Sequence, residues 1–146
     1  MAEMLQFYMQ VYARPAEAAP GPPQIVAGCR VTPLVASQAD LVAGLPITFE
    51  QAAGALGQLP RMFIEPDGSF VWVSPEGEPA WQVDGVLYDR GQRLAYAELK
   101  GCCRAASLDE LLAALGWPQT ALAFALVPHG VVLGEEDFRR VAAGLS

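Results

Sequence analysis

The chain has 146 residues, of which 53% are hydrophobic and 17% charged, and its net charge is −7. This length and composition predict a single domain, residues 1–146, with a hydrophobic core, and they exclude a largely disordered chain. The excess of acids removes the sequence-independent attraction to phosphate backbones that most nucleic-acid-binding proteins have. A nucleic-acid substrate therefore requires a basic surface supplied by a partner protein or an oligomer.

The cellular location of the protein is indicated by what its sequence lacks. No run approaches the roughly 18 apolar residues that a membrane-spanning helix needs, and the N-terminus lacks the basic and apolar regions of a secretory signal. The three cysteines, Cys29, Cys102 and Cys103, have no spacing typical of a disulfide framework. They therefore favour reduced thiols and a cytoplasmic location. With His129 as the only histidine, a structural zinc site is not predicted.

The N-terminal segment, residues 1–13, is predicted to form a strand because apolar and polar side chains alternate along it. A proline-rich linker follows at residues 14–23, where four of the ten residues are proline. Residues 24–35 again have the character of a strand, which Pro33 interrupts. A short helical turn is expected to begin at Ser37.

The first predicted helix begins at Thr48, because Thr48 and Gln51 fit a capping box in which each side chain binds the backbone N–H of the other residue. Pro60 ends this helix. The short apolar segments 62–64 and 70–73 then flank a Pro-Asp-Gly turn, which predicts a hairpin.

The C-terminal part of the chain is predicted to alternate between helix and strand. Ser107 and Glu110 fit a second capping box, which starts a helix, and residues 121–127 form a continuous apolar segment typical of a buried strand. A helix over residues 135–146 closes the chain. With the hairpins, these elements predict an α+β fold with a central, mostly antiparallel sheet flanked by helices, whose core spans residues 48–127.

A second hairpin carries the residues best suited to chemistry. Residues 81–101 are predicted to form two strands joined by a three-residue turn. This register sets Gln82 opposite Lys100 and Asp84 opposite Glu98, with the Cβ atoms of the two acids roughly 5 Å apart. A two-residue turn would shift the register. Because side chains alternate along a strand, Asp84, Glu98 and Lys100 share one face, and the other face is apolar.

Asp84, followed after thirteen residues by a Glu-x-Lys motif at Glu98 and Lys100, resembles the signature of the PD-(D/E)XK nuclease-like superfamily. The order helix, three strands, helix, strand over residues 48–127 is also similar to the restriction-endonuclease-like core of that family. The resemblance implies that Asp84 and Glu98 hold Mg²⁺, and that Lys100 orients or helps to deprotonate the attacking water. Members often add a glutamate from the first helix, which implies Glu50 as a third metal ligand.

Two functions are consistent with these residues. The first is a metal-dependent nuclease that hydrolyses phosphodiester bonds, with Asp84, Glu98 and Lys100 as catalytic residues and with help from a partner protein. That Lys100 is the only lysine favours this function, since arginine could supply a surface charge but not a neutralisable amine. The alternative is a non-catalytic protein-interaction or scaffold domain. In that case the three residues are structural or a degenerate site, and the N-terminal strand pairs with a partner or forms a homodimer.

Overall fold

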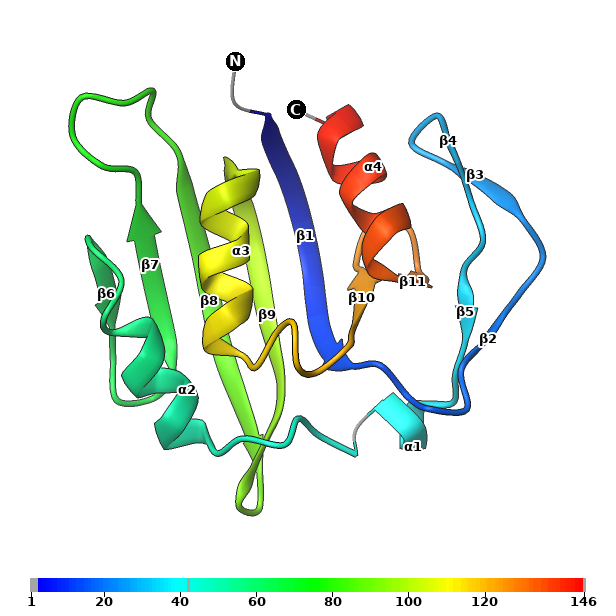
Figure 1. Ribbon diagram of the computed structural model, residues 1–146, viewed down its shortest axis with the longest axis horizontal. Helices are drawn as coiled ribbons and strands as arrows, with labels where there is room; N and C mark the ends of the chain where they lie inside the picture. The colour runs from blue at the N-terminus through cyan, green and yellow to red at the C-terminus, as the bar shows by residue number, and fades with distance from the viewer. Residues whose placement is uncertain (1–2, 42, 146) are drawn as a thin grey trace.

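The centre of the structure is an antiparallel sheet. The computed structural model describes residues 3–41 and 43–145. Seven strands within them form the sheet: β1 (Met4–Ala13), β6 (Met62–Ile64), β7 (Ser69–Val73), β8 (Gln82–Arg90), β9 (Arg93–Arg104), β10 (Leu122–Leu126) and β11 (Val131–Leu133). Their order across the sheet is β11-β10-β1-β9-β8-β7-β6, and every neighbouring pair is antiparallel (Figure 1).

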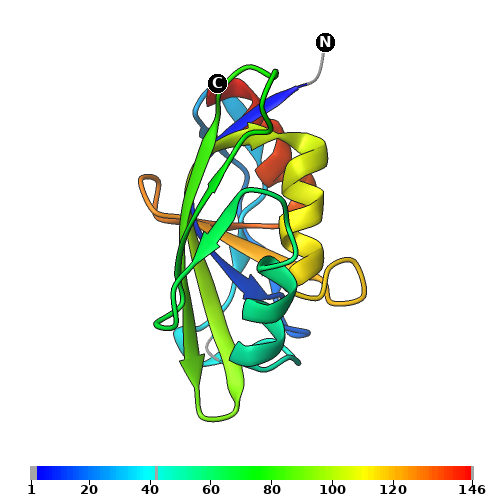
Figure 2. The same ribbon diagram turned by 90° about the vertical axis from the view of Figure 1, so that its left-hand side faces the viewer.

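Three helices cover one face of this sheet: α2 (Phe49–Leu56), α3 (Ala105–Ala114) and α4 (Glu135–Leu145). When the sheet is seen from its edge, all three lie on the same side of the strands (Figure 2). The prediction of an α+β fold with a large, mostly antiparallel sheet is therefore confirmed, with these helices on a single side. No helix of the described chain is long and apolar enough to cross a membrane.

Strand β1 lies in the middle of the sheet, between β9 and β10, although it begins the chain. Its alternating sequence explains this position. Leu5, Phe7, Met9 and Val11 are all buried and belong to the hydrophobic core beneath the helices, as expected for a strand with one packed face. The polar residues of the alternation, such as Gln10, face the other way. The predicted N-terminal strand thus completes the sheet from Met4 onward, while residues 1–2 of the predicted range lie outside the described residues.

Residues 14–41 leave the sheet, and their strands β2 to β5 run outside α4 (Figure 1). Their elements are β2 (Ala19–Pro20), β3 (Gln24–Val26), β4 (Cys29–Val31), β5 (Leu34–Val35) and the single turn α1 (Gln38–Leu41). Strand β2 pairs with β5, and β3 pairs with β4. The Arg140 side chain in α4 donates to the carbonyl oxygen of Arg30 at 2.9 Å. The predicted proline-rich linker, residues 14–23, therefore contains a short strand. The segment that contains β2 to β5 is attached to α4 by the bond from Arg140.

The two predicted capping boxes have different outcomes. At α2, the Gln51 backbone N–H donates to Thr48 Oγ1 at 3.0 Å, and the Thr48 N–H donates to Gln51 Oε1 at 2.9 Å, which confirms the first box. The second is wrong, because α3 begins at Ala105 with Arg104 as its N-cap and Ser107 lies inside the helix. Strand β9 extends to Arg104, and the chain turns directly from that strand into the helix.

The hairpin of β8 and β9 differs in register from the predicted one. Its turn has two residues, Gly91 and Gln92, instead of three, and β9 contains one extra residue at a β-bulge. Together these changes shift the pairing by two residues, so Asp84 lies opposite Lys100 and not opposite Glu98. Because a shift of two residues keeps side chains on their own faces, Asp84, Glu98 and Lys100 stay on the polar face. Leu94, on the turn side of the bulge, departs from the alternation and is buried in the core.

Candidate functional site

The predicted catalytic residues lie on the face of the sheet that α2, α3 and α4 leave uncovered, here called the open face. Asp84 on β8 is directly opposite Lys100 on β9, and Glu98 is opposite Val86. The intervening Leu99 is buried on the helix side. The structure therefore brings Asp84, Glu98 and Lys100 to neighbouring positions of one surface, but it does not place the two carboxylates opposite each other.

A glutamine amide binds each of the two carboxylates. Gln82 Nε2 donates to Asp84 Oδ1 at 2.8 Å, and Gln10 Nε2 donates to Glu98 Oε1 at 3.2 Å. An amide is a neutral donor, so these bonds orient the carboxylates and leave their negative charges uncompensated. Both acids thus have a local partner that is not a cation.

Lys100 has no carboxylate partner in the described part of the chain, where none of the ion pairs within 4.0 Å involves its ammonium group. The Nζ atom instead lies over the ring of Tyr8, 4.9 Å from the ring centroid, which is a cation–π contact. The Lys100 side chain is exposed. Its charge is therefore accessible to a group from another molecule.

The Mg²⁺ site implied by the resemblance requires a third ligand from Glu50. Glu50 is in the first turn of α2, and α2 covers the face opposite to the one that bears Asp84 and Glu98 (Figure 2). Across residues 3–41 and 43–145, no three His, Cys, Asp or Glu side chains are grouped closely enough to hold a metal ion. The residues in place do not fit a three-carboxylate site, and Mg²⁺ binding by Asp84 and Glu98 alone stays a prediction.

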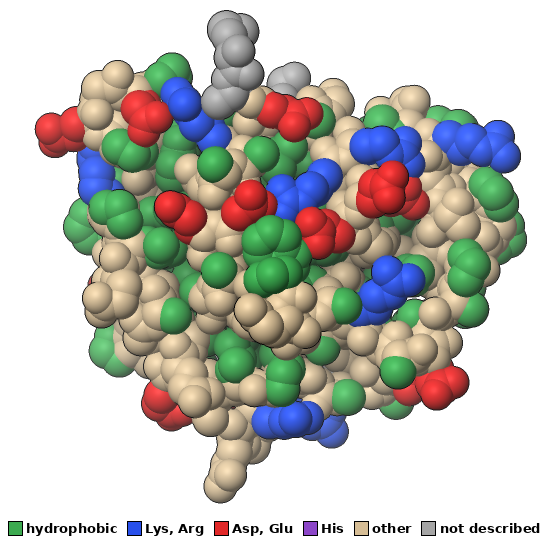
Figure 3. Space-filling model, in the orientation of Figure 1, with side chains coloured by type: hydrophobic (Ala, Val, Ile, Leu, Met, Phe, Trp, Pro, Cys, Tyr) green, Lys and Arg blue, Asp and Glu red, His purple; other side chains and the backbone are tan. Residues whose placement is uncertain are grey.

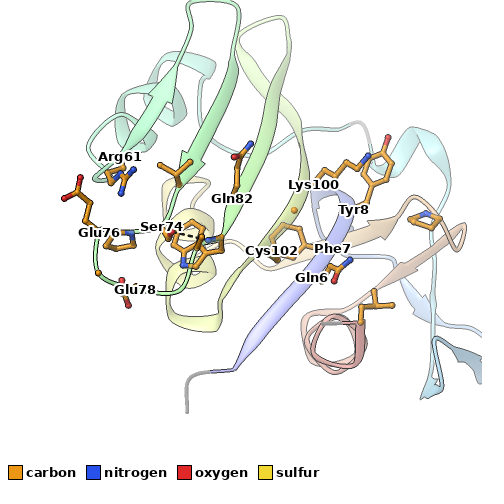
Figure 4. A pocket seen from close by; sticks show the side chains of 18 of the residues that line it. Gln6, Phe7, Tyr8, Arg61, Ser74, Glu76, Glu78, Gln82, Lys100 and Cys102 are labelled. Atoms are coloured by element: carbon orange, nitrogen blue, oxygen red, sulfur yellow. Dashed lines mark hydrogen bonds between the residues drawn. The ribbon is translucent and has the colours of Figure 1, made fainter.

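A cleft of about 1080 Å³ opens on the same face, with Lys100 among its lining residues (Figure 4). Strands β1 and β9 form its floor, and its walls are the loop over residues 74–80 and the turn at residues 128–129. This turn projects from the sheet on the side away from the helices (Figure 2). Neither Asp84 nor Glu98 lines the cleft. The cleft therefore combines Lys100 with a set of residues different from those of the nuclease motif.

The charged residues of the cleft lie in two groups (Figure 4). Lys100 is on one side, and Arg61, Glu76 and Glu78 are on the other. Glu78 forms an ion pair with Arg104 at 3.3 Å, and exposed pairs of this kind contribute little to stability. Lys100 has Asp84 and Glu98 beside it on the open face, whereas the opposite side of the cleft is lined by charges of both signs.

One buried donor on the cleft has no acceptor. Trp81 lines the cleft and is only 5% exposed, and its indole Nε1 has no hydrogen-bond partner among the described residues. The other two tryptophans differ, since Trp72 Nε1 donates to the Pro60 carbonyl oxygen at 3.0 Å and Trp117 Nε1 donates to Glu135 Oε1 at 2.7 Å. A buried donor without an acceptor costs about 1–3 kcal/mol. Nε1 is covered from the cleft, so a bound molecule would remove this cost only if the covering atoms moved aside.

Arg61, which also lines the cleft, has a left-handed backbone conformation with φ of 61°. For a residue with a Cβ this conformation costs about 1–2 kcal/mol. The Val73 backbone N–H donates to the Arg61 carbonyl oxygen at 3.3 Å and helps to hold the conformation. Within the described residues the Arg61 guanidinium forms no ion pair. Strained residues cluster at binding sites, so Arg61 is a second feature that indicates a ligand for this cleft.

Burial raises the pKa of three other groups of the sheet, none of which lines the cleft: Cys103, Tyr12 and Tyr96. Cys102 lines the cleft, whereas Cys103 is buried on the helix side. Burial raises the pKa of the Cys103 thiol to about 12, so this thiol stays protonated at neutral pH and is not a nucleophile. Tyr12 and Tyr96 stack with their ring centroids 5.0 Å apart, and burial raises the pKa of each. These hydroxyls therefore do not act as bases near neutral pH.

No protein-family model matches the chain, and no curated protein or solved structure is significantly similar to it. The open face and its cleft are therefore the features that indicate a function.

Sequence reasoning identified Lys100 but missed Trp81 and Arg61 as members of a site. The hairpin pattern places Trp81 on the apolar face, which is where it is buried. Whether an indole N–H finds an acceptor depends on segments that are distant in the sequence, as the bond from Trp72 to Pro60 shows. No local signal distinguishes the three tryptophans.

Replacing each of two packed tryptophans by phenylalanine is expected to have unequal effects. Trp72 and Trp81 are both buried and contact each other edge to face, with ring centroids 5.0 Å apart. Trp72→Phe and Trp81→Phe therefore remove similar volumes, but only Trp72→Phe also removes a hydrogen bond. We expect Trp72→Phe to lower the free energy of unfolding by about 1 kcal/mol more than Trp81→Phe does, as measured by urea unfolding. Equal losses would show that Trp81 Nε1 also has an acceptor.

Proposed function

We propose that this chain is a non-catalytic protein-interaction domain that binds a segment of a partner protein in the cleft of the open face. The observation that carries the proposal is the buried N–H of Trp81, which lines the cleft and lacks an acceptor. Nε1 itself is covered in the structure, so a backbone carbonyl of the partner would accept this hydrogen bond only after the atoms that cover it move aside. The bond would be formed only in the complex, and it would therefore contribute to affinity and to specificity.

The size of the cleft supports a polypeptide as its occupant. Pockets for small molecules typically have volumes of about 300–1,000 Å³, and this cleft reaches about 1080 Å³. Its two walls are far apart in the sequence, at residues 74–80 and 128–129. An extended segment that crossed the sheet between these walls would contact both of them and present a carbonyl oxygen at every residue.

The remainder of the open face also has apolar surface that a partner could cover. Phe63 on β6 and Val71 on β7 lie directly opposite each other, and their exposed fractions are 62% and 38%. Adjacent exposed apolar side chains are typical of interaction surfaces. They support a protein partner that extends beyond the cleft toward the β6 edge of the sheet.

A peptide array tests the proposal. Short random-sequence peptides are immobilised through their N-termini and probed with the labelled wild-type protein, with Trp81→Phe and with Trp117→Phe as a matched control. Trp117 donates to Glu135 and does not line the cleft. We expect the wild type and Trp117→Phe to bind the same subset of peptides, and we expect Trp81→Phe to bind this subset about tenfold more weakly, because it lacks the N–H donor.

Two results of the array would overturn the proposal. One is that the wild-type protein retains no peptide above background. The other is that Trp81→Phe binds the selected peptides with the affinity of the wild type, which would place their binding site elsewhere.

The nuclease hypothesis concerns the same face and stays a prediction, as does a restriction-endonuclease-like core. In its favour, Asp84, Glu98 and Lys100 share the open face on two neighbouring strands. The helix side of the molecule carries acidic and basic side chains that are interspersed, without a continuous basic surface in that view (Figure 3). The nuclease hypothesis therefore still requires a partner to hold nucleic acid.

A Mg²⁺ titration distinguishes the two functions. Under the binding proposal, Mg²⁺ changes the melting temperature of the wild type no more than that of the double variant Asp84→Asn, Glu98→Gln. Under the nuclease hypothesis, the two carboxylates bind the ion, so Mg²⁺ raises the melting temperature of the wild type alone. A Mg²⁺-dependent rise that the double variant lacks would contradict the binding proposal as stated.

A further inference from the structure

We infer that the partner segment ends inside the cleft and that its C-terminal carboxylate binds Lys100. This inference rests on the proposed function, because it specifies which part of a partner protein the cleft accepts. It combines three features of the open face: an ammonium group without a carboxylate partner, acids that other side chains already bind, and a wall beyond the ammonium group.

Lys100 is prepared for an anion from outside the chain. Its two nearest acids are Asp84, directly opposite, and Glu98, two residues earlier on the same strand. The amide of Gln82 binds Asp84, and the amide of Gln10 binds Glu98. Because each carboxylate is oriented by its own amide, neither forms an ion pair with Lys100 within 4.0 Å.

The Tyr8 ring positions the ammonium group. Lys100 Nζ lies 4.9 Å from the ring centroid of Tyr8, and both side chains line the cleft. The Lys100 side chain extends across the floor of the cleft toward Tyr8 (Figure 4). A lysine held in this way loses less side-chain entropy when an anion binds than a freely rotating lysine does.

The local charge favours a single carboxylate over a phosphate group. Asp84 and Glu98 lie next to Lys100, and the whole chain has a net charge of −7. Arg61, the other basic residue that lines the cleft, is on the opposite side (Figure 4). The two acids repel any anion that binds Lys100, and they repel a phosphate group, which carries about two negative charges at neutral pH, more strongly than a single carboxylate.

The wall beyond Tyr8 favours the end of a chain over a continuous segment. The Val127 backbone N–H donates to the Tyr8 carbonyl oxygen at 3.0 Å, which places the end of β10 next to Tyr8. The turn at residues 128–129 follows directly and projects from the open face (Figure 2). A segment that runs from the loop at residues 74–80 toward Lys100 would meet this turn. A terminal carboxylate fits there without any continuation of the chain.

The test uses the peptides that the wild-type protein selects on the array, each synthesised with a free C-terminal carboxylate and with a C-terminal amide. We expect amidation to weaken binding to the wild type by about tenfold or more, because a charge-assisted hydrogen bond is lost. Lys100→Met is expected to bind both forms equally weakly. Arg90→Gln removes an exposed positive charge at the far end of β8, and this control variant is expected to keep the difference between the two forms.

The outcomes separate the inference from the proposed function. If the selected peptides bind the wild type equally well as acid and amide, the inference is wrong and the proposed function stands. The inference is also wrong, and the proposed function again stands, if the peptides depend on Lys100 through their own Asp or Glu side chains and not through their C-terminus. A preference for the acid that persists in Lys100→Met places the carboxylate elsewhere and also overturns the inference. If no peptide binds, the proposed function itself fails.

Discussion

The packing of three helices against a single face of the sheet is the constraint on which the rest of the structure depends. It buries Leu99, and because side chains alternate along β9, it leaves Lys100 on the open face. The packed face is tight, since the Phe70 ring occupies the space beside Gly85, where an added Cβ would lie 2.1 Å from Phe70 Cζ. With no helix layer opposite, the open face has room for a cleft of about 1080 Å³.

The hydrogen bonds of the open face are those expected of the proposed binding surface. The acids Asp84 and Glu98 accept from neutral amides, while the donors Lys100 and Trp81 have no acceptor among the described residues. The cleft thus offers donors to a ligand that carries acceptors.

The fold class and the two faces of the hairpin could be predicted from the sequence, whereas the partners of individual residues could not. Alternation along β1 and the capping box at Thr48 are local patterns, and both predict elements that the structure contains. The partner of Asp84 depends on turn length and on a β-bulge, which no single residue type specifies. The missing acceptor of Trp81 depends on segments that are distant in the sequence, so the key feature of the cleft has no sequence signature.

The indole N–H resonances of the three tryptophans in isotope-labelled protein test the central claim most directly. They are assigned with single Trp→Phe variants and recorded before and after addition of a selected peptide. We expect the Trp81 proton to resonate upfield of those of Trp72 and Trp117 in the free protein, because only Trp81 lacks an acceptor. We expect it alone to move downfield when the peptide binds. A Trp81 proton that is already hydrogen-bonded in the free protein, or that stays unchanged while the peptide binds, would contradict this account.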